Sequence, residues 1–265
     1  MQEIIRFLKR VKDHITIFFI TNEYWQAKVQ KKYNLQQGLP VIELDELLPN
    51  FEDEVKMSTF SFSNSLFTDY ALIKGLCRKF ENCKYFEIGT WKGESVANAA
   101  AVSEKAVTLN LSSEELRAFN LPEEYINLMG HFSKDIPNVV HLKGNSRTYD
   151  FEALNEKFDV VFIDGDHHYE MVKIDTENVF KHLIHENSIV IWHDYGFNPE
   201  QVRHEVFLGI LDGLPQELHK NVYHVSNTSA AVYLKGNYNT KTLKKYATPN
   251  RSFKINIKSF PLDNH

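Results

Sequence analysis

The sequence predicts an α/β fold built on a doubly wound, mainly parallel sheet. From residue 84 onward, short apolar runs alternate with segments of helical periodicity, which is typical of crossover units around a parallel sheet. The run 158–163 is strongly apolar, as expected of a strand that is buried on both faces. Polar residues follow directly after several of these runs, where open α/β sheets bind their ligands.

Seven strands are expected, of which the last is antiparallel to the others. A helix capped by Thr68 is expected from Asp69 to about Phe80, ahead of the first strand. Ser112 and Glu115 form a capping box at the start of a later helix. The other expected helices are 93–101, 169–183 and 200–211, and the expected strands are 85–88, 106–110, 138–142, 158–163, 188–192, 222–225 and 231–234.

The sheet lies in a central domain, 56–236, with an N-terminal extension, 1–55, and a C-terminal tail, 237–265. The extension is expected to be helical, because apolar residues recur at helical spacing within 4–11. That helix either packs on the body or on a second subunit, which would make a homodimer, or lies as a basic helix on a membrane surface. In the tail, residues 253–258 alternate with period two and suggest an additional edge strand.

The composition and net charge of the chain indicate which kinds of binding partner to expect. The chain has 265 residues, of which 43% are hydrophobic, and a formal net charge of −5 at pH 7. A chain of this length can bury a large core, and its charge gives no indication of a nucleic-acid partner. The apolar run 15–20 is too short to cross a bilayer, so no membrane span is expected. Cys77 and Cys83 match neither a zinc nor a redox motif, and we expect reduced core cysteines in a cytoplasmic protein.

A glycine-containing turn, Glu87-Ile-Gly-Thr-Trp-Lys-Gly93, joins the first expected strand to a helix. Glycine there lets a ligand approach the backbone, and the helix amino end offers unpaired N–H donors. The segment resembles the first motif of class I S-adenosylmethionine-dependent methyltransferases, E/D-x-G-x-x-x-G, which implies a Rossmann-like fold. By this resemblance Gly89 and Gly93 shape the cofactor loop, Thr90 and Trp91 line it, and Glu87 faces the methionine amino end of the cofactor.

Two further positions extend the expected cofactor site. Asn110 ends the second strand, where sheets of this kind usually carry an acid that binds the ribose hydroxyls. An amide can also bond a hydroxyl, without the charge-assisted strength of a carboxylate. Ser146 follows the third strand, where the resemblance implies contact with adenine.

Charged side chains crowd the ends of the fourth and fifth strands. The segments are Ile-Asp-Gly-Asp-His-His-Tyr-Glu at 163–170 and Ile-Trp-His-Asp-Tyr-Gly at 191–196. A sheet without a ligand has little reason to place so many charges there. The two segments resemble small-molecule O-methyltransferases that use a divalent cation, in the branch with Asp-Gly-Asp-His and Trp-His-Asp motifs.

This second resemblance implies a metal site formed by Asp164, His193 and Asp194. It also makes His167 the general base, with Asp164 counted among both the catalytic and the cofactor-binding residues. A histidine with a pKa near neutrality suits a base, and a metal would lower the pKa of an acceptor hydroxyl. Oxygen ligands favour Mg²⁺, whereas an imidazole admits Mn²⁺, iron or zinc.

The expected function is S-adenosylmethionine-dependent O-methylation of a small molecule, such as a sugar or a similar metabolite. Two alternatives stay open. Cephalosporin-hydroxylase-type sequences share the pattern, so the Asp/His cluster could hold a redox iron. The second alternative is a non-catalytic S-adenosylmethionine-binding or scaffold protein. Its main support is Asn110, which stands where an acid is usual.

Overall fold

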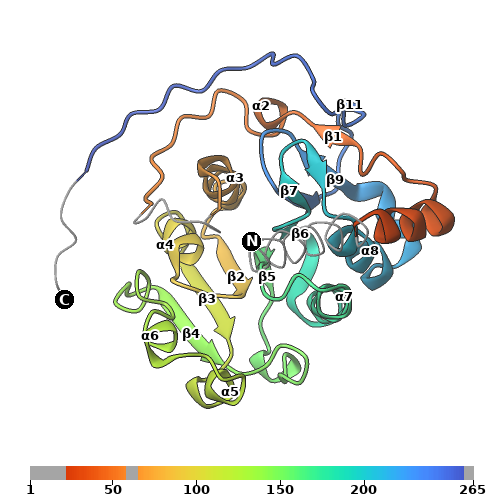
Figure 1. Ribbon diagram of the computed structural model, residues 1–265. Coiled ribbons are helices and arrows are strands. Elements are labelled where there is room, and N and C mark those ends of the chain that lie inside the picture. Colours follow the sequence, from red (N-terminus) through yellow and green to blue (C-terminus); the bar gives the residue numbers. More distant parts are fainter. Residues whose placement is uncertain (1–21, 58–64, 260–265) are drawn as a thin grey trace, which may run out of the picture.

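The computed structural model describes residues 22–57 and 65–259 of the chain, and its main feature is a nine-stranded sheet (Figure 1). The strand order is β11-β1-β9-β10-β6-β5-β2-β3-β4. A separate antiparallel pair joins β7 (Gly196–Asn198) to β8 (Gln201–Val202). The strands of the main sheet are β1 (Val41–Ile42), β2 (Lys84–Ile88), β3 (Lys105–Asn110), β4 (Val139–Lys143), β5 (Phe158–Ile163), β6 (Ile184–Trp192), β9 (Val222–Val225), β10 (Ala231–Tyr233) and β11 (Thr240–Lys241).

The seven predicted strands are all present, and the predicted fold class is confirmed. Strands β4, β3, β2, β5 and β6 are parallel neighbours, while β10 pairs antiparallel with both β6 and β9. From β2 the chain builds outward through β3 and β4, and then crosses to β5 and β6 on the other side. The carboxyl ends of β2 and β5 therefore form a topological switch point, where ligands bind in sheets of this type.

Helices cover both faces of the sheet and make three layers (Figure 1). Apolar residues of α2, α3 and α4 pack on one face, and those of α7, α8 and a helix at 22–33 pack on the other. The named helices are α2 (Leu44–Leu47), α3 (Phe67–Cys77), α4 (Glu94–Ala100), α5 (Ser113–Ala118), α6 (Glu123–Ile126), α7 (Tyr169–Asn178) and α8 (His204–Gly213), with short 3-10 turns η1 (Glu152–Leu154) and η3 (Gln216–Asn221) and a π-helical turn η2 (Val179–Leu183).

Strand β2 shows why this sequence needs both layers. Its alternate side chains Tyr85 and Phe86 point to opposite faces, and each is fully buried in a different core cluster. This central strand is thus covered on both sides. Cys77 and Cys83 are buried and free of disulfide bonds, as predicted.

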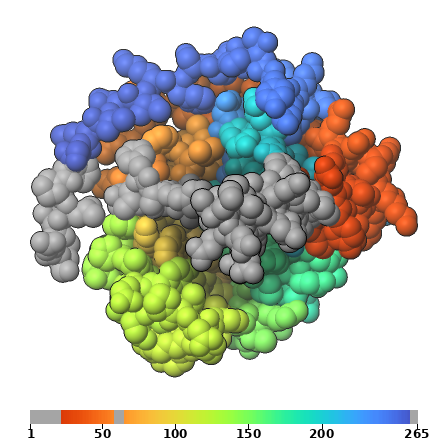
Figure 2. Space-filling view, in the orientation of Figure 1, coloured from red at the N-terminus to blue at the C-terminus, as the bar shows by residue number. Residues whose placement is uncertain are grey.

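Local details differ from the sequence expectations at three places. The predicted helix 200–211 begins only at His204, because Gln201–Val202 pair with β7 as strand β8. Helix α3 begins at Phe67 rather than at Asp69, and the Thr68 hydroxyl donates to the carbonyl of Asn227 instead of capping the helix. Residues 253–258 form no strand, because the part of the tail that follows β11 runs as an extended segment over the surface without a sheet partner (Figure 1 and Figure 2). The capping box of Ser112 and Glu115 is confirmed.

Both flanking segments contribute to the main sheet. Val41–Ile42 pairs with β9, and Thr240–Lys241 pairs with Val41–Ile42 at the sheet edge. These two-residue strands were not predicted, and the domain boundaries stay a prediction. The apolar stripe within 4–11 lies outside the described residues. Within 22–57 and 65–259, no helix is both long and apolar enough to cross a membrane.

Candidate functional site

The loop 89–93 follows β2 at the switch point of the sheet. Its backbone has positive φ angles of 96° at Gly89, 42° at Trp91 and 85° at Gly93. A Cβ atom at Gly89 would lie 2.1 Å from the carbonyl oxygen of Asp164. Glycine is therefore required both by the backbone conformation and by the close approach of the end of β2 to the end of β5.

Glu87 lies on β2 directly before this loop and is completely buried. Its carboxyl group accepts hydrogen bonds from the Tyr85 hydroxyl at 2.8 Å and from the Thr108 hydroxyl at 3.0 Å. Burial raises the pKa of Glu87 to about 8, so the side chain is largely protonated at neutral pH. The carboxyl group of Glu87 thus links β2 to β3 through Thr108. Its contact with a cofactor stays a prediction.

The two predicted lining residues of the loop have different surroundings. The Thr90 hydroxyl is buried and lies 2.6 Å from the Thr108 hydroxyl. Trp91 is only partly buried, and its ring lies 4.2 Å from that of Tyr125, measured between centroids. The carbonyl of Trp91 also accepts a hydrogen bond from the backbone of Gly130 at 2.6 Å. The loop is thus held in place by a segment that follows α6.

Asn110 and Ser146 lie at the ends of β3 and β4, where the sequence predicted nucleoside contacts. The Asn110 side chain accepts from the Thr90 backbone at 3.5 Å and donates to the Leu111 carbonyl at 3.3 Å. The Ser146 carbonyl accepts from the Asn178 side chain on α7 at 3.1 Å. Both residues therefore support neighbouring loops, and their predicted roles toward a nucleoside stay predictions.

A cluster of Asp164, His167 and Asp194 lies at the adjoining carboxyl ends of β5 and β6. Nδ1 of His167 lies 2.9 Å from Oδ2 of Asp194, and all three side chains are partly exposed. One ligand atom from each residue lies within 4.8 Å of the others. In the part of the chain that the structure describes, this is the one group of His, Cys, Asp or Glu side chains able to hold a metal ion.

His193 lies beside this cluster, deeper in the protein. Its Nδ1 is 3.1 Å from Oδ1 of Asp164 and 3.5 Å from Oδ2 of Asp194. Its side chain is 10% exposed, compared with 44% for His167. His193 therefore faces both carboxylates of the predicted metal site, whereas His167 faces the solvent side.

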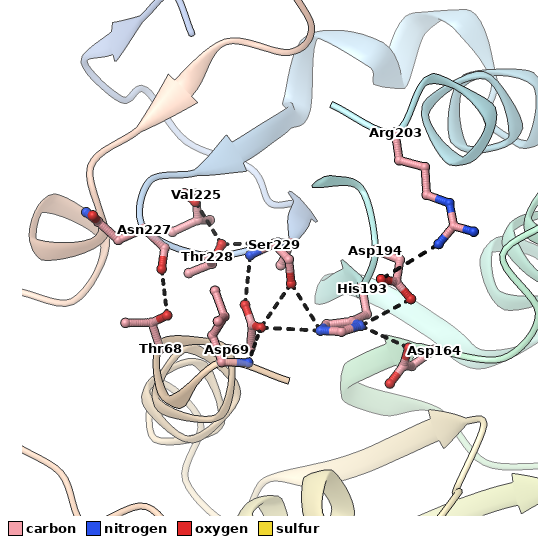
Figure 3. A network of polar contacts seen from close by, with 12 residues as sticks. Thr68, Asp69, Asp164, His193, Asp194, Arg203, Val225, Asn227, Thr228 and Ser229 are labelled. Carbon is pink, nitrogen blue, oxygen red and sulfur yellow. Dashed lines mark hydrogen bonds and ion pairs between the residues drawn. The ribbon is translucent and has the colours of Figure 1, made fainter. Parts of the chain in front are cut away.

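Behind His193, Asp69 and Ser229 complete a polar network that joins three distant parts of the chain (Figure 3). His193 Nε2 lies 3.3 Å from Oδ2 of Asp69 and 3.1 Å from Oγ of Ser229. Asp69, which is 2% exposed, accepts hydrogen bonds from both the backbone N–H and the hydroxyl of Ser229 at 2.9 Å. These contacts fix the orientation of the His193 ring.

The charges in the cluster are strongly coupled. Although burial opposes its ionisation, His167 and His193 hold the pKa of Asp194 well below its usual range. In turn, contact with Asp194 raises the pKa of His167, against the effect of burial. Burial also opposes the imidazolium form of His193, but Asp164, Asp194 and Asp69 raise its pKa well above the ordinary value. Burial raises the pKa of Asp164, and the positive charge of His193 works against that rise.

Arg203, which directly precedes α8, reaches the outer side of the cluster (Figure 3). Its Nη1 lies 3.9 Å from Oδ1 of Asp194, and its guanidinium carbon lies 5.4 Å from the ring centroid of Phe197. The side chain is 24% exposed. The cluster, His193 and Arg203 thus bring together two acidic side chains, two imidazoles and one guanidinium at the adjoining ends of β5 and β6.

Three residues of this site were missed at the level of sequence. Asp69 gave a weak signal, because it is an acid next to the apolar stripe of a helix. Ser229 lies in the segment Ser-Asn-Thr-Ser, 226–229, between the last two expected strands, where a serine is common. Arg203 lies in a predicted helix, and nothing in the sequence relates it to Asp194.

Residues 86–195 match the model of a family described as a methyltransferase domain. This segment runs from β2 past the end of β6, so it contains the loop 89–93 and all three members of the Asp164, His167 and Asp194 cluster. This match confirms the predicted methyltransferase domain over these residues. A comparison with curated proteins finds no match.

Several solved structures resemble parts of the chain at low identity. They include the YcgJ protein of Bacillus subtilis (13% identity, TM-score 0.34, 46% of this chain and 48% of that one). Another is CalS10, an amino pentose methyltransferase of Micromonospora echinaspora (15% identity, TM-score 0.35, 50% of this chain and 50% of that one). A third is the O-methyltransferase TomG of Streptomyces achromogenes (17% identity, TM-score 0.45, 65% of this chain and 82% of that one). The chain spans about half the length of the first two, and at these TM-scores the fold assignment rests on the strand order alone.

Proposed function

We propose that this protein transfers a methyl group from S-adenosylmethionine to a hydroxyl group of a small molecule, with His167 as the general base. The observation that carries the proposal is the contact of His167 with Asp194, 2.9 Å long, at the strand ends beside the glycine loop. Loop and cluster adjoin because Gly89 packs directly on the backbone of Asp164. We further propose that the catalytic unit corresponds to residues 56–236.

The side chains present suit the two ends of such a reaction. When bound, S-adenosylmethionine supplies a methyl group that its sulfonium already makes electrophilic. The loop 89–93 would hold it close to the backbone, with Glu87 and Asn110 as the polar groups nearest its ends. Holding two reactants in line contributes roughly 7–11 kcal/mol to barrier lowering.

His167 has the surroundings of a base in such a transfer. Because its Nδ1 faces Asp194, its Nε2 is the atom available to accept the hydroxyl proton as the C–O bond forms and the C–S bond breaks. Asp194 orients the ring and stabilises the imidazolium that results, as the acid does in other His–Asp pairs. A positioned base contributes about 10²–10⁴-fold to the rate.

We propose in addition that a divalent cation assists the reaction, held by Asp164 and Asp194. Two carboxylates with an imidazole within ligand distance of one another fit such an ion. His193 would be the third ligand, because its Nδ1 lies 3.1 Å from Oδ1 of Asp164 and 3.5 Å from Oδ2 of Asp194, and His167 then keeps its Nε2 for the role of base. A bound ion would favour the ionised form of an acceptor hydroxyl.

The test is a pair of histidine variants. His167→Ala should reduce S-adenosylhomocysteine release from S-adenosylmethionine, measured across a panel of small hydroxyl compounds, by about 10²–10⁴-fold. Calorimetry should show unchanged binding of S-adenosylhomocysteine. His168→Ala is the matched control, because His168 is 77% exposed and pairs with Asp166 outside the cluster.

Three outcomes would contradict the proposal. If His167→Ala keeps near-wild-type turnover, His167 is not the general base. Iron-dependent oxygen consumption without methyl transfer would favour the hydroxylase alternative. A wild-type protein that binds no S-adenosylhomocysteine at millimolar concentration would indicate a scaffold protein instead.

A further inference from the structure

Arg203 lies at the outer side of the candidate site, with its side chain 24% exposed. Its guanidinium carries five N–H donors in a planar fork that matches a carboxylate or phosphate group. Within residues 22–57 and 65–259, its side chain has one ion pair, the 3.9 Å contact with Asp194, and one ring contact, with Phe197. An arginine that serves only to hold a carboxylate usually forms shorter, bidentate hydrogen bonds.

The charge of Asp194 is already balanced without Arg203. One imidazole, His167, lies 2.9 Å from its Oδ2, and a second, His193, lies 3.5 Å from the same oxygen. Arg203 faces the other oxygen at a greater distance. The guanidinium is therefore the positive group of this cluster with the most unused hydrogen-bonding capacity.

From this arrangement we infer that the methyl acceptor carries a carboxylate or phosphate group, which Arg203 binds, a few bonds away from the hydroxyl that is methylated. The short span follows from geometry, since the base His167 and Arg203 contact the two oxygens of one carboxylate. Phe197 lies against the guanidinium and provides an apolar surface beside it. The inference deepens the proposed function and rests on it for the identity of the hydroxyl end.

The experiment compares acidic ligands with neutral partners of the same shape. Calorimetry would measure binding of 3,4-dihydroxybenzoate against catechol, and of glucose 6-phosphate against glucose, to the full-length protein with and without saturating S-adenosylhomocysteine. The first pair tests a carboxylate and the second a phosphate. The variants are Arg203→Gln, which removes the charge, and Arg203→Lys, which keeps the charge but loses the fork. Arg117→Gln is the control, because Arg117 pairs with Glu123 on an exposed surface far along the chain from the site.

In the wild type and in Arg117→Gln, the acidic member of at least one pair should bind about tenfold more tightly than its neutral partner or better. Arg203→Gln should abolish this preference and Arg203→Lys should retain part of it, with binding of S-adenosylhomocysteine unchanged. Equal binding within both pairs, or a preference that survives in Arg203→Gln, would overturn the inference. If the wild type binds no S-adenosylhomocysteine, the proposed function fails, and the measurements without it still decide whether Arg203 binds acids.

Discussion

The two halves of the candidate site shift the pKa of an acidic side chain in opposite directions. On the cofactor side, Glu87 is fully buried among hydroxyl groups, and burial raises its pKa to about 8. On the acceptor side, the Asp194 side chain is only partly exposed. Its partial burial opposes ionisation, but the two histidines hold its pKa well below the usual range. Both acids lie at or near the ends of strands in one sheet. The difference shows that positively charged partners, rather than depth alone, decide which acid is ionised.

After His167→Ala, the largest effect is expected from Asp194→Asn, which removes the charge on the acceptor side. The imidazolium of His167 loses its stabilisation, so we expect methyl transfer to fall on the order of a hundredfold. His167 acts as a base only when neutral, so the wild-type rate should rise with pH through a pKa above the ordinary 6.5. In the variant, the rise should move to lower pH.

Rate–pH profiles at saturating Mn²⁺ and with a chelator separate the loss of a metal ligand from the loss of the base partner. Asp166→Asn is the control, because Asp166 pairs with His168 rather than with His167. An unchanged inflection in Asp194→Asn would show that His167 does not depend on Asp194.

The next effect concerns the contact between the two halves. Gly89→Ala places a methyl group against the carbonyl of Asp164 and forces an L residue to a φ of 96°. We expect a loss of about 2 kcal/mol in the free energy of unfolding and weaker binding of S-adenosylhomocysteine. Denaturant unfolding and calorimetry measure the two quantities.

Gly165→Ala is the matched control for this substitution. It lies across the same contact, has no positive φ, and its nearest neighbour to an added Cβ is 3.4 Å away. If Gly165→Ala is as damaging as Gly89→Ala, the cost does not come from the close approach at Gly89.

The last effect is a pH dependence of stability that arises from Glu87. The folded protein keeps the proton on Glu87 to about pH 8, whereas the unfolded chain loses it near 4.5. Between these values the folded state binds more protons, so stability falls as pH rises, by up to about 1.4 kcal/mol per pH unit. Glu87→Gln should flatten the curve of unfolding free energy against pH in this window, and Glu104→Gln, at an exposed position, should not.

The fold and the acceptor-side cluster could be predicted from sequence because their signals are local. Apolar runs give the strands, and the charged residues Asp164, His167 and Asp194 lie within a few positions of two strand ends. Parallel pairing of β5 with β6 then brings these ends together. Asn110 also lies at its predicted strand end, although its side chain bonds to neighbouring backbone.

What the sequence could not predict depends on long-range packing. Asp69 and Ser229 meet His193 from positions 124 and 36 residues away, and no local pattern marks that meeting. Strands β1 and β11 have two residues each, too few for a periodic signal. Arg203 reaches Asp194 only because β7 and β8 turn the chain back before α8.

The central claim is that the glycine loop and the His167–Asp194 pair form the two ends of one methyl-transfer site. A crystal structure with S-adenosylhomocysteine and Mn²⁺ tests it most directly. The account predicts S-adenosylhomocysteine along residues 89–93 with its sulfur facing the Asp164, His167 and Asp194 cluster, and Mn²⁺ on Asp164 and Asp194. S-adenosylhomocysteine bound away from this loop, or with its sulfur directed away from His167, would contradict it.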